Sequence, residues 1–103
     1  MEVLKKGTVE SLLIAMRDRL EVLTDLDNVT SRLFDVKLKD DDSAVQTNIA
    51  WSRHASKPMT GIFPIDTTLA AYVIGKEYKL YVKFTSGLDI VVKGPIFFRV
   101  EDD

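Results

Sequence analysis

The feature that most constrains the fold is a two-residue alternation in the last quarter of the chain. After Gly75, apolar side chains at every second position define one face of a strand: Tyr78, Leu80, Val82 and Phe84. Residues 86–89, Ser-Gly-Leu-Asp, have the composition of a short hairpin loop. A return strand follows, with apolar side chains at Ile90, Val92, Ile96, Phe98 and Val100. The alternation predicts an antiparallel hairpin, with a bulge or bend at Gly94-Pro95 because neither residue suits a regular ladder.

Similar alternation occurs earlier in the chain. Residues 34–38 alternate apolar and charged side chains, and residues 45–51 place Val45, Ile49 and Trp51 on one face. The acidic run from Asp40 to Ser43 between them predicts a turn. Residues 59–65 predict another short strand, which we expect at a sheet edge or bulge because it contains Pro64.

The first third of the chain is compatible with two structures. One is an amphipathic helix over residues 8–23, because the apolar residues follow helical spacing: Val9, Leu12, Leu13, Met16, Leu20 and Leu23. The other is a strand over residues 9–17, a turn at Asp18-Arg19 and a short strand over 20–23. In that second structure, the side chains that face the core are those of Leu12, Ile14 and Met16.

The composition places the chain among soluble globular proteins. Its 103 residues suit one domain, residues 1–103, with 46% apolar and 29% charged residues. The net charge of −2 argues against nucleic-acid binding, which usually requires a basic excess. There is no cysteine, and we see neither a signal peptide nor a membrane span. Several short strands separated by turns indicate a β-sandwich.

The order of these features resembles a family of immunoglobulin-like domains in tailed-phage virion proteins, in particular the amino-terminal domain of baseplate upper proteins. The matching segments are Lys6-Gly7-Thr8, Asp18-Arg19, residues 23–26, residues 34–39, Gly61-Ile62-Phe63, residues 65–67, residues 75–81 and residues 94–100. The resemblance favours the strand interpretation of the first third. The fold we expect is therefore an all-β, immunoglobulin-like β-sandwich of about seven strands. The alternative is an α+β fold with the helix at residues 8–23 packed on an antiparallel sheet.

The resemblance also implies a function: a structural subunit of the virion that acts by packing against other proteins. We see no carboxy-terminal extension for a receptor-binding part, so we expect a head, neck or tail connector, an adaptor or a decoration protein. The expected partners are other virion proteins and copies of the chain itself, not nucleic acid or a membrane. The expected location is the virion, assembled in the host cytoplasm. The alternative function is a carbohydrate- or ligand-binding adhesion module, with recognition by Trp51 and the loop at Arg53-His54.

Residues suited to catalysis or metal binding are few. His54 is the single histidine, and its neighbours Arg53 and Lys57 would repel a cation. The run Asp40–Asp42 lacks EF-hand spacing, because Val45 and Trp51 occupy the glycine and glutamate positions. Ser52 lies near His54 in sequence, but no nucleophile-elbow or phosphate-loop motif accompanies them. We therefore predict no enzyme activity, no catalytic residue, no metal site and no cofactor.

One candidate protein-contact surface follows from the hairpin. If its even-numbered apolar residues face the core, the outward face carries Tyr81, Val91, Phe97 and Arg99. Exposed aromatic side chains beside arginine are typical of protein interfaces. The alternative is that Gly94-Pro95 changes the register, because a one-residue slip turns every side chain to the other face. Trp51 shares a face with Val45 and Ile49, and we expect it in the core.

Overall fold

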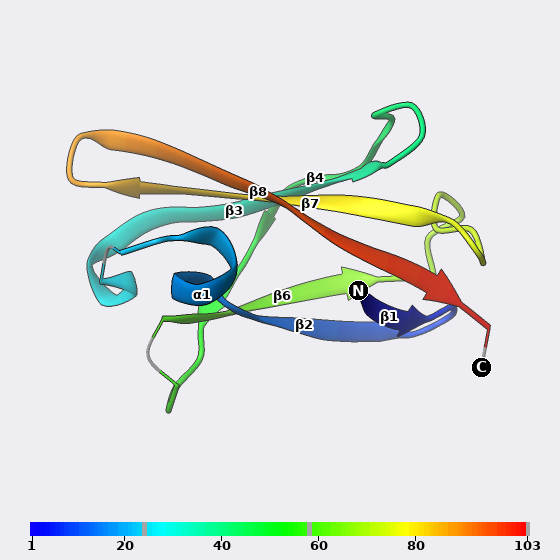
Figure 1. Ribbon diagram of the computed structural model, residues 1–103, viewed down its shortest axis with the longest axis horizontal. Helices are drawn as coiled ribbons and strands as arrows, with labels where there is room; N and C mark the ends of the chain where they lie inside the picture. The colour runs from blue at the N-terminus through cyan, green and yellow to red at the C-terminus, as the bar shows by residue number, and fades with distance from the viewer. Residues whose placement is uncertain (24, 58, 103) are drawn as a thin grey trace.

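A computed structural model describes residues 1–23, 25–57 and 59–102, which form two packed β-sheets (Figure 1). The larger sheet has the order β1-β8-β7-β3-β4, and the smaller sheet has the order β2-β6-β5. The strands of the larger sheet are β1 (Glu2–Lys5), β3 (Val29–Leu38), β4 (Ala44–Ala50), β7 (Glu77–Ser86) and β8 (Asp89–Glu101). The strands of the smaller sheet are β2 (Val9–Ala15), β5 (Ser52–Arg53) and β6 (Thr60–Asp66). A short helix, α1 (Met16–Leu20), and a 3-10 turn, η1 (Leu26–Asn28), connect β2 to β3.

This arrangement is an all-β sandwich of the immunoglobulin-like kind, as predicted. The strands β3, β7 and β8 take the places of strands C, F and G, β4 takes that of C′, and β2, β6 and β5 take those of B, E and D. The strand β1 pairs in parallel with the end of β8, with Glu2 opposite Phe98 and Lys5 opposite Glu101. The described residues form eight strands, one more than expected, because the two-residue β5 pairs with β6.

The first third of the chain forms a strand followed by one helical turn. In β2, Leu12 and Ile14 face the core, and Met16 at the start of α1 is also buried, as the strand interpretation predicted. The long helix over residues 8–23 is wrong, and so is the short strand over residues 20–23, since α1 ends at Leu20. Leu20 nevertheless reaches the core from the helix and is 7% exposed.

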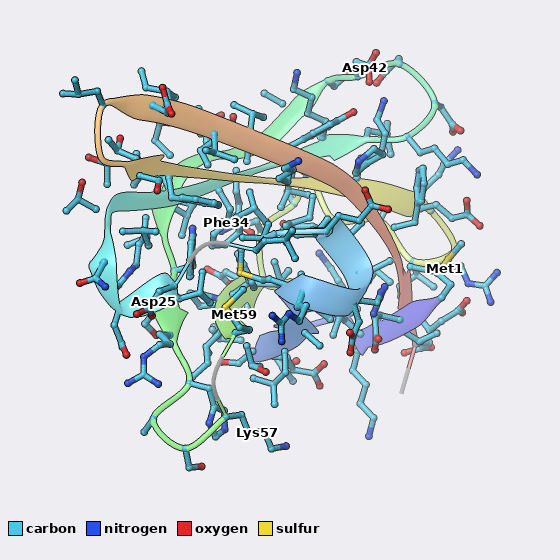
Figure 2. The ribbon with its side chains drawn as sticks, turned by 60° about the vertical axis from the view of Figure 1, so that its left-hand side comes forward. Met1, Asp25, Phe34, Asp42, Lys57 and Met59 are labelled. Carbon is cyan, nitrogen blue, oxygen red and sulfur yellow. The ribbon has the colours of Figure 1, made fainter. Side chains whose placement is uncertain are left out.

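The core lies between the two sheets and is rich in aromatic side chains. Phe63 of β6 stacks on Trp51, with ring centroids 5.3 Å apart, and meets Phe34 of β3 edge to face at 5.4 Å. Figure 2 shows Phe34 between the layers, with Asp42 and Lys57 far out on loops. Trp51 is 4% exposed and its Nε1 donates to the Lys83 carbonyl at 3.2 Å, so the prediction that it is a core residue is confirmed.

A buried tyrosine fixes the start of β7. The Tyr78 hydroxyl accepts a hydrogen bond from the Val73 amide at 2.6 Å and donates to the Ala71 carbonyl at 3.0 Å. This is the tyrosine corner of immunoglobulin-like sandwiches, in which a tyrosine at the start of strand F ties down the preceding loop. Tyr72 packs on Tyr78 with ring centroids 4.9 Å apart, and burial raises the pKa of the Tyr72 phenol.

The predicted hairpin is β7 and β8. It closes on Ser86 and Asp89 with Gly87 and Leu88 in the loop, and only Gly87 has a positive φ, +62°, as in a type II′ turn. At the predicted bulge, Gly94 and Pro95 together face Tyr81, because Val82 pairs with Lys93 and Leu80 with Ile96. Gly94 has φ +135°, and a Cβ there would lie 2.7 Å from the Leu80 carbonyl oxygen. The position therefore requires glycine.

The strand β6 does not lie at a sheet edge as predicted. It is the middle strand of the smaller sheet, between β2 and β5. Pro64 is tolerated because β5 pairs only with Gly61 and Ile62, so that β6 has β2 as its single neighbour at Pro64.

Candidate functional site

Three of the four predicted contact residues lie on the outer face of the larger sheet. We call Tyr81, Phe97 and Arg99 the aromatic face. Phe97 is 37% exposed and lies opposite Lys79, whereas its neighbours Ile96 and Phe98 are buried in the core. Tyr81 is half-buried and Arg99 is exposed. The larger sheet thus brings two aromatic rings and a guanidinium group to the same side of the molecule.

Lysine side chains partly cover the aromatic rings. The Nζ atom of Lys37 lies 5.6 Å from the centroid of Tyr81, and that of Lys39 lies 5.4 Å from the centroid of Phe97, both within range of a cation–π interaction. Lys39 also binds Glu77 at 2.6 Å, and this hydrogen bond lowers the pKa of the Glu77 carboxyl. The face is therefore a mixture of rings and ion pairs and not a bare apolar patch.

Val91, the fourth predicted contact residue, faces the other way. It lies opposite the buried Phe84 and packs against the core. The prediction that it points outward is wrong because the bulge at Gly94-Pro95 adds one residue to β8, which reverses the side-chain alternation between the two halves of the strand. Its neighbours Ile90 and Val92 point outward instead and are 80% and 57% exposed.

The outer face of the smaller sheet is a second surface, which the sequence analysis did not identify. We define the small-sheet face by six outward residues of β2 and β6, namely Val9, Ser11, Leu13, Ala15, Ile62 and Pro64, and it ends at the outward Asp66, which lies opposite Val9. None of the six is charged, the carboxylate of Asp66 lies at one end of the face, and Val9 and Leu13 are both large and exposed. The outer face of an antiparallel sheet is usually polar, so this composition is unusual for a surface in contact with water. The signal was present in the sequence, because a strand over residues 9–17 with Leu12 and Ile14 inward leaves Leu13 and Ala15 outward.

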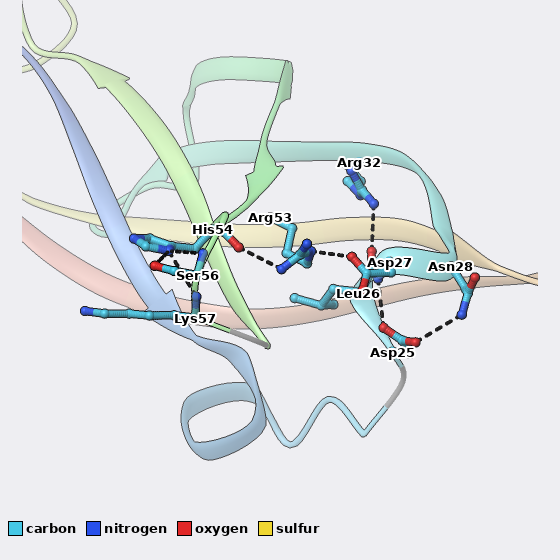
Figure 3. A network of polar contacts seen from close by, with 9 residues as sticks. All are labelled: Asp25, Leu26, Asp27, Asn28, Arg32, Arg53, His54, Ser56 and Lys57. Atoms are coloured by element: carbon cyan, nitrogen blue, oxygen red, sulfur yellow. Dashed lines mark hydrogen bonds and ion pairs between the residues drawn. The ribbon is translucent and has the colours of Figure 1, made fainter.

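A cleft of about 330 Å³ lies at the end of the sandwich near η1, lined by Arg17, Leu23, Asp25, Asp27, Arg53 and Met59. Figure 3 shows the polar contacts at its rim. Asp25 caps η1 by accepting from the Asp27 amide at 2.9 Å and from the Asn28 side chain at 3.0 Å. Arg53 pairs with Asp27 and donates to the His54 carbonyl at 2.8 Å. Of the charged groups that line the cleft, Arg53 and Asp27 therefore bind each other, and Asp25 is engaged by η1.

Arg32 lies between η1 and Trp51, next to the cleft. It donates to the Leu26 carbonyl at 2.7 Å, and its guanidinium carbon lies 5.9 Å from the Trp51 ring centroid. Its Nε atom is buried without a hydrogen-bond partner among the described residues. Arg32 thus ties η1 to the tryptophan at the end of β4 and acts within the fold.

His54 organises its own loop. Its Nδ1 atom accepts from the amides of Ser56 at 3.1 Å and Lys57 at 3.2 Å (Figure 3). The Ser56 hydroxyl also lies 3.5 Å from Nδ1, so this atom is shared between two backbone amides and one hydroxyl group of the same loop.

The three aspartates at 40–42 diverge to separate partners. Asp40 faces Lys76 at 3.5 Å, Asp42 pairs with Lys79, and Asp41 accepts from the Ser43 amide at 3.0 Å and from its hydroxyl. The hydrogen bonds from Ser43 lower the pKa of the Asp41 carboxyl. Across residues 1–23, 25–57 and 59–102, no three histidine, cysteine, aspartate or glutamate side chains group as metal ligands would.

The helices of the described chain are too short or too polar to cross a membrane. Comparison with known proteins found no match: no family model, no curated protein and no solved structure is significantly similar to the chain.

Proposed function

We propose that the chain is a non-enzymatic structural subunit of a tailed-phage virion, a connector, adaptor or decoration protein that works by packing against other virion proteins. The observation that carries this proposal is the small-sheet face. Six neighbouring outward positions without a charge, next to a single carboxylate at Asp66, include two large exposed aliphatic residues and form a surface that gains free energy when a partner removes it from water.

The position of the aromatic face supports a connecting role. The two faces are the outer surfaces of the two sheets, so they point away from each other on opposite sides of the sandwich. A subunit with contact surfaces on opposite sides can bind two neighbours at once, as a member of a ring or a layer does. Tyr81, Phe97 and Arg99 belong to the residue types that interfaces favour.

The proposal is tested by the protein content of purified particles. We expect mass spectrometry of gradient-purified phage, produced from the genome that encodes the chain, to find the protein at a fixed ratio to the other virion proteins. Absence of the protein from the particles would overturn the proposal.

A variant then locates the contact. Leu13→Asp places a charge in the middle of the small-sheet face, where it would have to be desolvated on docking. When supplied in trans to a phage lacking the gene, this variant should fold but fail to enter particles. Thr47→Asp, which places the same charge at an exposed position on β4, is the matched control and should be incorporated normally. Normal incorporation of Leu13→Asp would exclude the small-sheet face as the contact.

A second candidate, a carbohydrate- or ligand-binding adhesion module, is favoured by the cleft beside Arg53. Its volume is at the lower end of the range for small-molecule sites. The burial of Trp51 removes the aromatic surface that this function would have used. Nuclear magnetic resonance titration with neutral and acidic sugars tests it: saturable shifts confined to residues around Arg53 and Met59 would favour it over the structural role.

A further inference from the structure

The edge of β8 is only partly covered. On the side away from β7, β1 pairs with the stretch from Phe98 to Glu101. Next along the edge, residues 93–95 line a shallow pocket together with residues 18–21 at the end of α1. Over residues 89–92 no strand among the described residues occupies this side, and Figure 1 shows this arm of the hairpin projecting from the body of the sandwich.

This open stretch carries the most exposed aliphatic side chains of the hairpin. Leu88 in the loop is 102% exposed, Ile90 is 80% exposed and Val92 is 57% exposed. Natural edge strands are usually protected by charges, prolines or covering segments. In β8, β1 and the end of α1 cover the edge only from residue 93 onward, so that Ile90 and Val92 lie on the uncovered part.

The backbone of the open stretch is suited to pairing. The two-residue loop makes Ser86 and Asp89 a hydrogen-bonded pair, and hydrogen-bonded and non-hydrogen-bonded pairs alternate along an antiparallel ladder. Ile90 and Val92 therefore point their N–H and C=O groups away from β7, toward the open side. Another strand at this edge would find two donors and two acceptors.

We propose that the partner strand is the same segment of a second copy, paired antiparallel across a twofold axis at Val91. The sequence Asp-Ile-Val-Val-Lys over residues 89–93 is self-complementary in this register. Asp89 lies opposite Lys93 of the second copy, Ile90 lies opposite Val92, and Val91 lies opposite itself. Within the described chain neither Asp89 nor Lys93 forms an ion pair, so both charges are available to the second copy.

The backbone and the side chains select the same register. Ile90 and Val92, whose backbone groups point outward, are opposite each other and form the hydrogen-bonded pairs. Asp89 and Lys93 then form non-hydrogen-bonded pairs, in which side chains approach more closely. The two exposed aliphatic pairs lie together on the outer face of the joined sheet.

The ends of the segment limit the pairing. The loop residue Leu88 would lie opposite Gly94, beyond which Pro95 offers no amide donor. The loop of each copy thus meets the bulge of the other, and the ladder stops after five residues. The result is a closed dimer with one continuous sheet and not an open fibre.

This inference rests on the proposed function, because it assumes that the chain works by packing against proteins and names a second copy as one of them. The test is sedimentation equilibrium of the full chain from low to high micromolar concentration. We expect a monomer–dimer equilibrium. Asp89→Lys and Lys93→Asp each place like charges opposite each other, and we expect each to weaken the dimer by roughly tenfold.

Mixing the two variants provides the decisive measurement. In the mixed dimer, the register places both lysines of the Asp89→Lys segment opposite the two aspartates of the Lys93→Asp segment. Opposite charges therefore meet at both ends, and the mixture should associate more tightly than either variant alone. Asp40→Lys, which changes the net charge as Asp89→Lys does but on a distant turn, is the control for that variant and should dimerise as the wild type does.

A backbone variant tests the hydrogen bonds independently of charge. Val92→Pro removes an amide donor that β7 does not use, so circular dichroism should show a folded sandwich while the dimer is lost. A monomeric wild type at all concentrations, a mixture no tighter than its components, or a Val92→Pro variant that still dimerises would each overturn the self-pairing. None of those outcomes would test the proposed function, which is tested separately by the particle assay and by Leu13→Asp, neither of which involves β8.

Discussion

The Tyr78 hydroxyl group makes two hydrogen bonds to the loop that precedes β7. It satisfies the Val73 amide and the Ala71 carbonyl at once, in a buried setting. We expect Tyr78→Phe to lower the free energy of unfolding by about 1–3 kcal/mol, because it leaves both groups without this partner. Urea denaturation measures the change, and the slope with denaturant should stay constant.

The matched control for Tyr78→Phe is Tyr81→Phe. The Tyr81 ring lies on the outer face under Lys37, and its hydroxyl makes no hydrogen bond within the described residues. The same chemical change there should leave the stability nearly unaltered. Equal losses at the two positions would mean that the corner contributes nothing beyond the phenol itself.

Glu77 links stability to pH at the same end of β7. Its hydrogen bond from Lys39 lowers the pKa of the carboxyl below the value in the unfolded chain. A lowered pKa stabilises the fold above the ordinary glutamate pKa, and the contribution is lost as the pH falls through the folded-state value. We expect the free energy of unfolding to fall below about pH 4, and to fall less steeply in Glu77→Gln.

Lys39→Met removes the partner instead of the carboxylate and should flatten the pH profile in the same way as Glu77→Gln. Thermal unfolding at a series of pH values measures both variants. A wild-type slope in either variant would show that this ion pair does not contribute to the acid sensitivity.

At the scale of elements, β2 shows why the sequence of the first third of the chain is compatible with both a helix and a strand. Its inward residues Leu12 and Ile14 identify a strand, but Val9, Leu13 and Ala15 on the outer face are apolar or small as well. A strand that is apolar on both faces loses the clean alternation and acquires apolar residues three and four positions apart, which is helical spacing. The apolar residues of the small-sheet face are thus the reason that the sequence of β2 is also compatible with a helix.

The strand β8 shows that alternation identifies a strand but does not predict side-chain orientation across a bulge. The bulge at Gly94-Pro95 was predictable from the residue types, but the number of residues that it adds depends on pairing with β7. The orientation of Phe97 and Arg99 was predicted correctly, because they follow the bulge together with the buried residues Ile96 and Phe98. Val91 lies beyond the bulge and was not.

The aromatic face yields a prediction at this scale. We expect Tyr81→Ser and Phe97→Ser to retain the fold, because both rings lie outside the core, and to reduce incorporation into particles. Phe98→Ser is the matched control on the same strand, since its ring stacks on Tyr78 at 5.6 Å, and it should abolish folding. Circular dichroism and particle content measure the two effects. Unfolded Tyr81→Ser and Phe97→Ser proteins would show that the rings stabilise the sandwich.

For the whole molecule, the packing of the two sheets depends on a few large rings. Phe63 of the smaller sheet contacts Phe34 and Trp51, so it joins the layers directly. We expect Phe63→Ala to cost about 3–5 kcal/mol and to weaken both sheets together. Far- and near-ultraviolet circular dichroism should report one coincident unfolding transition. Separate transitions would mean that the sheets unfold independently.

The sandwich as a whole was accessible from the sequence because its longest strands alternate clearly, as in residues 78–84. The cleft was not, because Arg17, Asp27, Arg53 and Met59 come from separate segments that meet only in the folded chain. The same holds for the pairing of β1 with β8, which depends on where the amino end lies after the sheets have packed.

Trp51 is the single tryptophan of the chain, and its indole lies between the layers with its N–H bound to Lys83. Its fluorescence therefore reports separation of the two sheets, and because the side chain is already buried in the monomer, pairing of two copies does not withdraw it further from water. Emission wavelength and fluorescence anisotropy become separate signals in one sample: the first follows unfolding, and the second follows the slower tumbling of an assembled species. The natural sequence thus carries its own optical label, with no added dye and no engineered residue.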